Sequence, residues 1–309
     1  MLVVCGKAIS NNEIIQKFLK DYNTAVIFQD FSPNPTYESV IQGLEIFNDN
    51  NCDCILAIGG GSAIDVAKCI KAFDSIESPK CDYLNCNIKE STIPLIAIPT
   101  TAGAGSEATK FAVIYYQGEK KSIEHESLIP DAVLFESSLL YTLPLNQKKS
   151  TVLDALCHGI ESYWSKNTTV ESRIYADQAI HLVLDNYNNY FDNNEDACMK
   201  MQEAAYMAGK AINITKTTAA HALSYKLTTL YNIPHGQAVA ICLKKVWEYT
   251  LSLAIKENNI QLLKALKDLA SAFKVDNEEQ AIVRFSNLLN ELDIDCKIAV
   301  SYTHLTLPT

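Results

Sequence analysis

Four side chains in the second half of the sequence have the chemistry of ligands for a divalent metal ion. Asp154 and His158 are four residues apart in a helical pattern, so a carboxylate and an imidazole lie on one face of the predicted helix. His221 lies in another helical pattern, and His235 follows where a loop enters a further helix. One carboxylate and three imidazoles suit Fe(II), Zn(II) or a similar ion. Each histidine alone is better explained as a hydrogen-bonded interior residue, so the prediction rests on the set.

Two loops in the first half are rich in glycine and hydroxyl groups. The first loop, residues 59–62 (GGGS), directly follows an apolar strand pattern and directly precedes a helical one. Backbone N–H groups in such a turn, together with the positive end of the helix, suit a pyrophosphate. The second loop, residues 99–107 (PTTAGAGSE), follows another predicted strand, at the edge where open α/β sheets bind ligands. A turn without a ligand is the alternative for each loop alone, but the two together predict a nucleotide site.

A nucleotide on one domain and a metal ion on the facing domain are the parts that hydride transfer requires. The metal would polarise an oxygen atom while a nicotinamide exchanges a hydride, in a cleft between the domains. Pure phosphate chemistry is less favoured, because no P-loop lysine follows the glycines and imidazole suits Mg(II) poorly.

Two different domains must position these side chains. Up to about residue 135, apolar β-rich runs alternate with helical patterns, and this alternation predicts βαβ units with a parallel sheet. The β-rich runs are LVVC, TAVIF, CILAIGG, IPLIAIP and AVLF. From about residue 146 onward, helix-period segments follow at residues 150–165, 170–190, 195–213 and 262–273. We therefore predict an α/β nucleotide-binding domain over residues 1–143 and an all-α metal-binding domain over residues 144–309.

Composition and charge exclude several classes of protein. The 309 residues are 48% apolar, enough to fill two cores. No apolar run reaches the ~18 residues of a membrane span, and a formal net charge of −10 offers no basic surface for nucleic acid. Ten cysteines without a CxxC pair predict reduced thiols and a cytoplasmic location. We expect a small-molecule partner, with no nucleic acid and no membrane.

Both ends of the sequence are abrupt. The first residues lead directly into an apolar strand, and residues 301–309 (SYTHLTLPT) have neither helical periodicity nor charge. This nonamer resembles translated adapter or vector sequence, so its His304 receives no role. We therefore expect a chain truncated at both ends.

An ordered set of motifs spans most of the chain. In sequence order the motifs are GGGSAIDVAK, PTTAGAGSEATK, LIPDAVLFESSLLYTLP, DALCHGIES, HALSY and IPHG. The set closely resembles the iron-containing (group III) alcohol dehydrogenase family, over residues 2–249. The resemblance implies a Rossmann-like N-terminal domain and an all-α C-terminal domain, a fold similar to that of dehydroquinate synthase. It also implies NAD(P)-dependent interconversion of an aldehyde and a primary alcohol, with Fe(II) as the metal and Zn(II) as the alternative.

The resemblance assigns roles residue by residue. Its metal ligands are Asp154, His158, His221 and His235. Its cofactor-binding positions are Gly59, Gly60, Gly61 and Ser62 in the pyrophosphate loop, Asp65 and Lys68 in the helix after it, and Thr100 and Thr101 in the second loop. Many members carry a second histidine four residues after the third ligand, as a proton relay, and this chain has Tyr225 there. We expect Tyr225 and His235 at the catalytic centre.

A second departure concerns the cofactor. Many NAD-specific members end the first strand with an aspartate that repels a 2′-phosphate, whereas this chain has Gly6 at about that position. We therefore expect either NADH or NADPH to bind. The chain is also shorter than family members, and absent C-terminal helices would leave the cleft open to water. The resemblance further implies a homodimer or a larger assembly.

The substrate is the least determined part of the prediction. Residues 209–243 look most like the branch that reduces phosphonoacetaldehyde to 2-hydroxyethylphosphonate. The cations near the motifs that could attract such an anion are Lys149, Arg173, Lys216 and Lys226. The alternatives are a dehydrogenase of short-chain primary alcohols, of the butanol or lactaldehyde type, a dehydroquinate synthase-like lyase, and an inactive fragment that binds without turnover. His125 and His181 lack suitable partners and receive no role.

Overall fold

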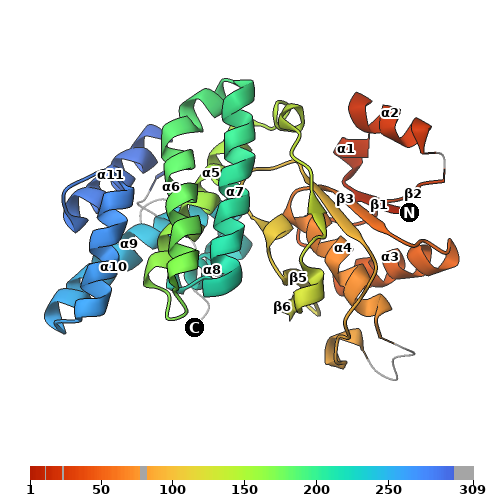
Figure 1. Ribbon diagram of the computed structural model, residues 1–309, viewed down its shortest axis with the longest axis horizontal. Coiled ribbons are helices and arrows are strands. Elements are labelled where there is room, and N and C mark those ends of the chain that lie inside the picture. Colours follow the sequence, from red (N-terminus) through yellow and green to blue (C-terminus); the bar gives the residue numbers. More distant parts are fainter. Residues whose placement is uncertain (11, 23, 77–81, 296–309) are drawn as a thin grey trace.

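The structure of the protein, a computed structural model, describes residues 1–295 with the exception of residues 11, 23 and 77–81. A sheet with its covering helices lies beside a bundle of long helices (Figure 1). The adapter-like segment with His304 lies outside the described residues, as do Cys81 and Cys296.

Five short parallel strands form the sheet, in the order β2-β1-β3-β4-β7. They are β1 (Leu2–Cys5), β2 (Val26–Phe28), β3 (Ile55–Gly59), β4 (Leu95–Pro99) and β7 (Ala132–Val133). β1 and β3 are buried along their whole length, as expected for central parallel strands that are covered on both faces. All five β-rich runs of the sequence form strands of this sheet, so the predicted parallel α/β architecture is confirmed.

Short and medium helices connect these strands. They are α1 (Lys7–Ser10), α2 (Glu13–Asp21), α3 (Tyr37–Asp49) and α4 (Gly61–Asp74). α3 begins after Thr36, whose side chain accepts a hydrogen bond from the Ser39 backbone N–H at 3.3 Å. α4 follows β3 directly and is buried over most of its length. The N-terminus of α4 is therefore fixed at the carboxyl edge of the sheet.

An antiparallel hairpin, which the sequence pattern does not indicate, is formed by β5 (Phe111–Tyr116) and β6 (Glu119–Glu124). Gln117 and Gly118 form its turn with φ angles of 52° and 79°, and two positive φ angles are typical of a tight type I′ hairpin turn. Only Ile123 is buried in β6. The strand has a charged sequence (EKKSIE) because most of its side chains face solvent, so an apolar pattern cannot reveal it.

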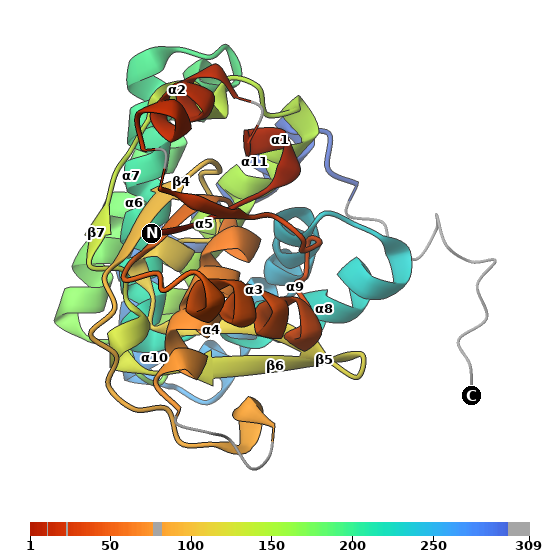
Figure 2. The same ribbon diagram turned by 90° about the vertical axis from the view of Figure 1, so that its right-hand side faces the viewer.

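The second part of the chain is all helical, as predicted. Its helices are α5 (Leu145–Trp164), α6 (Val170–Phe191), α7 (Glu195–Thr215), α8 (Ala219–Tyr231), α9 (His235–Lys256), α10 (Ile260–Ala272) and α11 (Glu278–Glu291). They enclose one apolar core in which Tyr190, Trp247 and Phe285 are fully buried. Figure 2 shows α8 on the side of the bundle that faces the β5–β6 hairpin. Among the described residues, no helix combines the length and apolar character that a membrane crossing requires.

The change from strands to helices falls between Val133 and Leu145, while the domain division at residue 143 stays a prediction. The two parts meet where the second glycine loop contacts α7. Gly105 has a φ of 63°, and a Cβ there would lie 2.6 Å from the Cα of Gly209 on α7. This close backbone approach requires glycine, and it brings the carboxyl edge of the sheet against the helices.

A candidate metal and nucleotide site in the cleft

Helix α5 presents three polar side chains on one face. Asp154, His158 and Glu161 are separated by four and then three residues, the spacing of one face of an α-helix. Their exposed fractions are 7%, 5% and 0%. Buried acidic and imidazole groups on one face of an apolar helix indicate a site with a ligand.

Imidazoles from three helices converge on one oxygen atom of Asp154. The Nε2 atoms of His158, His221 and His235 lie 3.9, 3.5 and 3.9 Å from Asp154 Oδ1. The rings of His158 and His221 are stacked, with their centroids 4.5 Å apart. Ligand atoms about 2.1 Å from a tetrahedral ion lie about 3.4 Å from one another. The three distances to Asp154 Oδ1 are therefore between about 0.1 and 0.5 Å longer than this separation.

Buried polar atoms without a hydrogen-bond partner lie at the centre of this cluster. Asp154 Oδ1 and His221 Nε2 have no hydrogen-bond partner in the described part of the chain. Leaving such atoms unpaired is destabilising, and a cation between them would remove the penalty. Asp154, His158 and His221 offer ligand atoms that all lie within 4.8 Å of one another. This donor set fits Fe(II) or Zn(II).

Burial and neighbouring charges set the protonation states of these groups. Burial alone would raise the pKa of Asp154, but the surrounding imidazoles hold it well below its usual range. Burial lowers the pKa of His158 to about 4 and also lowers the pKa of His235. Burial opposes the charge on His221 as well, yet the neighbouring carboxylates of Asp154 and Glu161 raise its pKa to about 9. At neutral pH a metal ion would therefore displace a proton from His221 and find the other three groups ready to bind.

His235 reaches the cluster from the first residue of α9. Its side chain is 40% exposed, unlike those of the other two histidines. The next residue, Gly236, packs directly on α5, because a Cβ there would overlap the backbone oxygen of Ser150. Its backbone N–H also donates to Ser150 Oγ at 3.2 Å. Gly236 thus allows α9 to approach α5 one turn before Asp154, a role that the sequence analysis does not assign.

Glu161 also belongs to this cluster, although the sequence analysis does not single it out. Its Oε2 contacts Nδ1 of His221. Its Oε1 accepts hydrogen bonds from the backbone N–H groups of Thr218 at 3.2 Å and Ala220 at 3.0 Å. The sequence signal is its position on α5, one turn after His158, on the face that carries the predicted ligands.

Tyr225 lies beside His235 at the edge of the cluster. The two rings are parallel within 1°, with centroids 5.9 Å apart. Lys120 Nζ, from β6, lies 3.5 Å from the centroid of the Tyr225 ring, a cation–π distance. Burial raises the pKa of Tyr225. Desolvation of the Lys120 ammonium in the cleft lowers its pKa to about 8, although the residue as a whole is exposed. Lys120 has no signal in the sequence, because the charged hairpin that carries it shows no apolar strand pattern.

A cleft of about 660 Å³ joins this cluster to the first glycine loop. Of the residues predicted to bind the cofactor, those that line the cleft are Gly61, Ser62 and Asp65. On the opposite side it is lined by Asp154, His158, His221, Tyr225 and His235. The structure therefore brings the predicted metal ligands and part of the predicted pyrophosphate loop to one cavity.

The other predicted loop residues lie directly behind this lining. The Thr100 backbone N–H donates to the Gly59 oxygen at 3.0 Å. A Cβ on Gly60 would lie 3.1 Å from the Thr101 side chain. The two glycine loops are thus packed against each other, so a change in either loop would displace the other.

Lys68 is fully buried and does not line the cleft. Its ammonium donates to the backbone oxygens of Ser106, Thr109 and Phe111 at 2.5, 2.5 and 2.8 Å. Asp65 accepts a hydrogen bond from the Ser106 hydroxyl at 2.5 Å. In this structure Lys68 therefore positions the second loop and does not face a ligand in the cleft.

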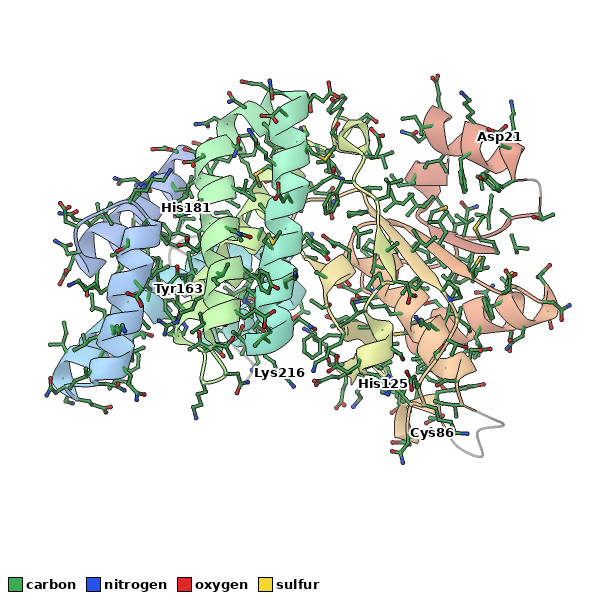
Figure 3. The ribbon with its side chains drawn as sticks, in the orientation of Figure 1. Asp21, Cys86, His125, Tyr163, His181 and Lys216 are labelled. Carbon is green, nitrogen blue, oxygen red and sulfur yellow. The ribbon has the colours of Figure 1, made fainter. Side chains whose placement is uncertain are left out.

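The four cations considered for an anionic substrate are dispersed. Lys149, Arg173 and Lys226 do not line the cleft. Lys216 does, but it forms an ion pair with Glu124 at 2.8 Å. Figure 3 shows Lys216 at the end of α7 on the side of the sheet domain.

His125 and His181, for which no role is predicted, lie in different parts of the molecule: His125 follows β6 in the sheet domain, and His181 is in α6 of the helical bundle (Figure 3). His125 Nδ1 is 2.8 Å from the Ser127 hydroxyl, and His181 Nδ1 is 3.5 Å from an Asp177 carboxylate oxygen. Neither histidine lines the cleft. Both have local partners that explain them without a ligand.

Both halves of the chain match one protein family. Residues 1–137 match the family model of iron-containing alcohol dehydrogenase, and residues 148–300 match that of the C-terminal domain of the Fe-containing alcohol dehydrogenase family. The NAD-dependent methanol dehydrogenase of Bacillus methanolicus is 32% identical over 259 residues, which are 81% of this chain and 68% of that protein. The NADPH-dependent butanol dehydrogenase of Clostridium saccharobutylicum is 28% identical over 307 residues, which are 95% of this chain and 76% of that protein.

Solved structures agree with these sequence matches. The crystal structure of sulfoacetaldehyde reductase from Bifidobacterium kashiwanohense in complex with NAD+ has a TM-score of 0.87 at 27% identity, covering 99% of this chain and 81% of that one. Among three curated relatives that are 31–34% identical, the chain spans 55%, 58% and 68% of the relative's length. The sheet, the helical bundle and the cluster on α5 are thus found in a chain that belongs to the iron-containing alcohol dehydrogenase family of oxidoreductases.

Proposed function

We propose that the protein is a metal-dependent, NAD(P)-linked alcohol dehydrogenase that interconverts a small aldehyde and its primary alcohol by hydride transfer. The observation that carries the proposal is the convergence of three histidine Nε2 atoms on Asp154 Oδ1 in the cleft that Gly61 and Ser62 also line. Relatives named as NAD- and NADPH-dependent alcohol dehydrogenases support it. Since the chain spans only part of several relatives, activity of this chain is itself part of the proposal.

The residues that would hold the metal are Asp154, His158, His221 and His235. A bound Fe(II) or Zn(II) supplies a Lewis acid that polarises a carbonyl oxygen. On the other side, α4 begins at Gly61, and its N-cap Gly60 has no side chain to cap the helix. The backbone N–H groups of Gly61 and Ser62 would therefore receive the cofactor pyrophosphate. The two walls would thus hold the aldehyde and the nicotinamide against each other.

Tyr225 is proposed to supply the proton for the product oxygen. Its pKa is raised by burial, so the phenol stays protonated at neutral pH and donates a hydrogen bond. Its ring lies against His235, at the edge of the proposed metal site. The cofactor ribose or a water molecule is the alternative donor.

For the substrate we propose an aldehyde with an anionic head, with phosphonoacetaldehyde as the first choice. Lys120 lines the cleft next to Tyr225 and provides a positive charge there. The sulfoacetaldehyde reductase of Bifidobacterium kashiwanohense is named for an aldehyde that also carries an acid group. A short-chain uncharged alcohol is the competing substrate, and the names of the methanol and butanol dehydrogenases favour it.

Either NADH or NADPH is proposed as the cofactor. A Cβ on Gly6, directly after β1, would meet no atom within 4 Å. Open space at this position, without a carboxylate, leaves room for a 2′-phosphate. A cytoplasmic location and a homodimer stay predictions.

The experiment follows NAD(P)H absorbance with Fe(II)-loaded protein, offering phosphonoacetaldehyde, butyraldehyde and lactaldehyde with each cofactor. Oxidation selective for phosphonoacetaldehyde supports the full proposal, and the Lys120→Met variant should then raise KM for that substrate but not for butyraldehyde. Preference for an uncharged aldehyde would retain the dehydrogenase and reject the anionic substrate. A lyase that recycles its cofactor would consume no NAD(P)H, and a chain that binds both ligands without turnover would be inactive with every aldehyde.

A further inference from the structure

We infer that Glu161 is a positioning residue of the metal site, because it fixes His221 in the orientation and tautomer that leave Nε2 free to bind the ion. The inference rests on the metal site of the proposed function. Glu161 is fully buried, and its Oε2 contacts Nδ1 of His221. When the far nitrogen of a ligating imidazole donates to a carboxylate, the ring is held in one tautomer with its other nitrogen available to the metal.

The other imidazoles of the cluster lack this support in the described structure. His158 Nδ1 is buried without a hydrogen-bond partner among the described residues, and the His235 side chain is 40% exposed. His221 is therefore the ligand whose geometry a carboxylate controls most directly. It is also the ligand whose Nε2 lies nearest to Asp154 Oδ1.

The second oxygen of Glu161 fixes the backbone that carries His221. Thr218 stands at the N-cap of α8, and its own side chain makes no capping hydrogen bond to the helix. Instead, the backbone N–H groups of Thr218 and Ala220 both donate to Glu161 Oε1. A carboxylate from α5 thus caps α8 and lies at its positive end. Because α5 also carries Asp154 and His158, Glu161 holds ligands from two helices in register before any ion binds.

The two backbone donors make Glu161→Gln a sharp test. Backbone N–H groups cannot accept a hydrogen bond, so the amide oxygen of the glutamine must face Thr218 and Ala220. Its NH₂ group must then face His221 Nδ1 and donate to it. That contact places the imidazole proton on Nε2, where it blocks metal binding, while the cap of α8 is kept.

Zn(II) affinity would be measured in competition with a chromogenic chelator, and ligand geometry by visible absorption of the Co(II)-loaded protein. Glu161→Gln is expected to bind Zn(II) about 10–100-fold more weakly than the parent and to change the Co(II) spectrum, while the metal-free protein melts as the parent does. Glu136→Gln is the matched control. Glu136 lies outside the cleft, and its carboxylate also accepts a hydrogen bond from a backbone N–H, that of Ser138 at 3.1 Å. Removal of the Glu136 charge should leave Zn(II) affinity unchanged.

Glu161→Asp keeps the carboxylate and is expected to recover part of the lost affinity. If the Asp and Gln variants are equally weak, Glu161 has only a structural role and the inference is overturned. A Glu161→Gln protein with the Zn(II) affinity and Co(II) spectrum of the parent overturns it as well. A parent that binds no Zn(II) or Fe(II) would instead reject the proposed function, so the two failures are distinguishable.

Discussion

The two walls of the cleft would hold their ligands by different means. In the wall from the sheet domain, Gly61 and Ser62 offer backbone N–H groups at a helix start, and the charged Lys68 lies behind them as support for the loop. In the helical wall, the Nε2 atoms of imidazoles from α5, α8 and α9 lie 3.5–3.9 Å from one carboxylate oxygen on α5. The wall from the sheet domain needs residues with little or no side chain, so that a ligand can reach the backbone N–H groups. The helical wall needs particular side-chain atoms as metal ligands.

This difference predicts different sensitivities. Adding a side chain to the backbone of the sheet-domain wall should weaken cofactor binding, whereas shortening a ligand side chain of the helical wall should weaken metal binding. Because the walls lie on different domains, each should fail without the other. Substitutions can therefore separate cofactor binding from metal binding.

The largest effect is expected when a ligand of the helical wall is removed. His235→Ala leaves one carboxylate and two imidazoles, so we expect metal affinity to fall more than about 100-fold, beyond the range for residues behind the ligands. Turnover should fall with it, while NADH binding stays unchanged. Metal content after dialysis, kcat and an NADH fluorescence titration check this. Full turnover in metal-free His235→Ala protein would refute the metal assignment.

The opposite result, weaker NADH binding with unchanged metal binding, is expected when a glycine of the sheet-domain wall is replaced. A Cβ on Gly61 would already lie 3.2 Å from the Cβ of Ala104, and a valine there would fill the space where a pyrophosphate approaches the backbone. Gly61→Val should raise the Kd for NADH about tenfold, or about 1.4 kcal/mol, with Zn(II) affinity unchanged. Equilibrium titrations with each ligand measure both. Parent-like NADH binding would show that this loop is not the pyrophosphate site.

Gly236 lies in the helical wall, but it is required there because it has no side chain and lets α9 pack closely on α5. Its Cβ would overlap the Ser150 oxygen, so in Gly236→Ala the start of α9 must move away from α5 and take His235 with it. Overpacking of this kind costs about 1–3 kcal/mol. We expect a lower melting temperature and weaker Zn(II) binding together, measured by thermal unfolding with and without the ion. A loss of stability with unchanged Zn(II) affinity would show that Gly236 does not position His235 in the metal site.

The smallest effect is expected for Glu107, a buried carboxyl group at the end of the second glycine loop. Burial raises the pKa of Glu107 from 4.5 to about 7, and its Oε1 has no hydrogen-bond partner among the described residues. Because the folded pKa is above the unfolded value, the stability that Glu107 contributes is complete below about pH 4.5 and is lost as the pH rises through about 7. Glu107→Gln should therefore raise the melting temperature at pH 8, by about 2–4 °C per kcal/mol, with little change at pH 4. Circular dichroism melts at both pH values test this, and an equal shift at both would contradict it.

The local parts of this site are predictable from the sequence, because they depend on spacing along one element. Asp154 and His158 stand at helical spacing on α5, and the GGGS turn lies between a strand and a helix, as the structure confirms. All five sheet strands are likewise visible as apolar runs, most clearly the central strands β1 and β3, which are buried along their whole length.

The remaining parts depend on contacts between elements that are distant in the sequence. Glu161 gains its partners only when α8 packs on α5. Lys120 enters the cleft on a charged hairpin that has no apolar signature. The family resemblance makes Lys68 a cofactor-binding position, yet its ammonium donates to backbone oxygens about forty residues later in the chain. The spacing of residues within one segment cannot predict these contacts between distant segments.

The most direct test of the two-walled cleft follows deuterium from the cofactor to the product. NADH in which both hydrogens on the reactive C4 of the nicotinamide are replaced by deuterium is mixed with an accepted aldehyde and with either Fe(II)-loaded or metal-stripped protein, and the alcohol is analysed by mass spectrometry. Direct hydride transfer in a metal-dependent site should place one deuterium on the alcohol carbon with the loaded protein and none with the stripped protein. Label transfer without metal, or no transfer when metal and NADH are both bound, would contradict it.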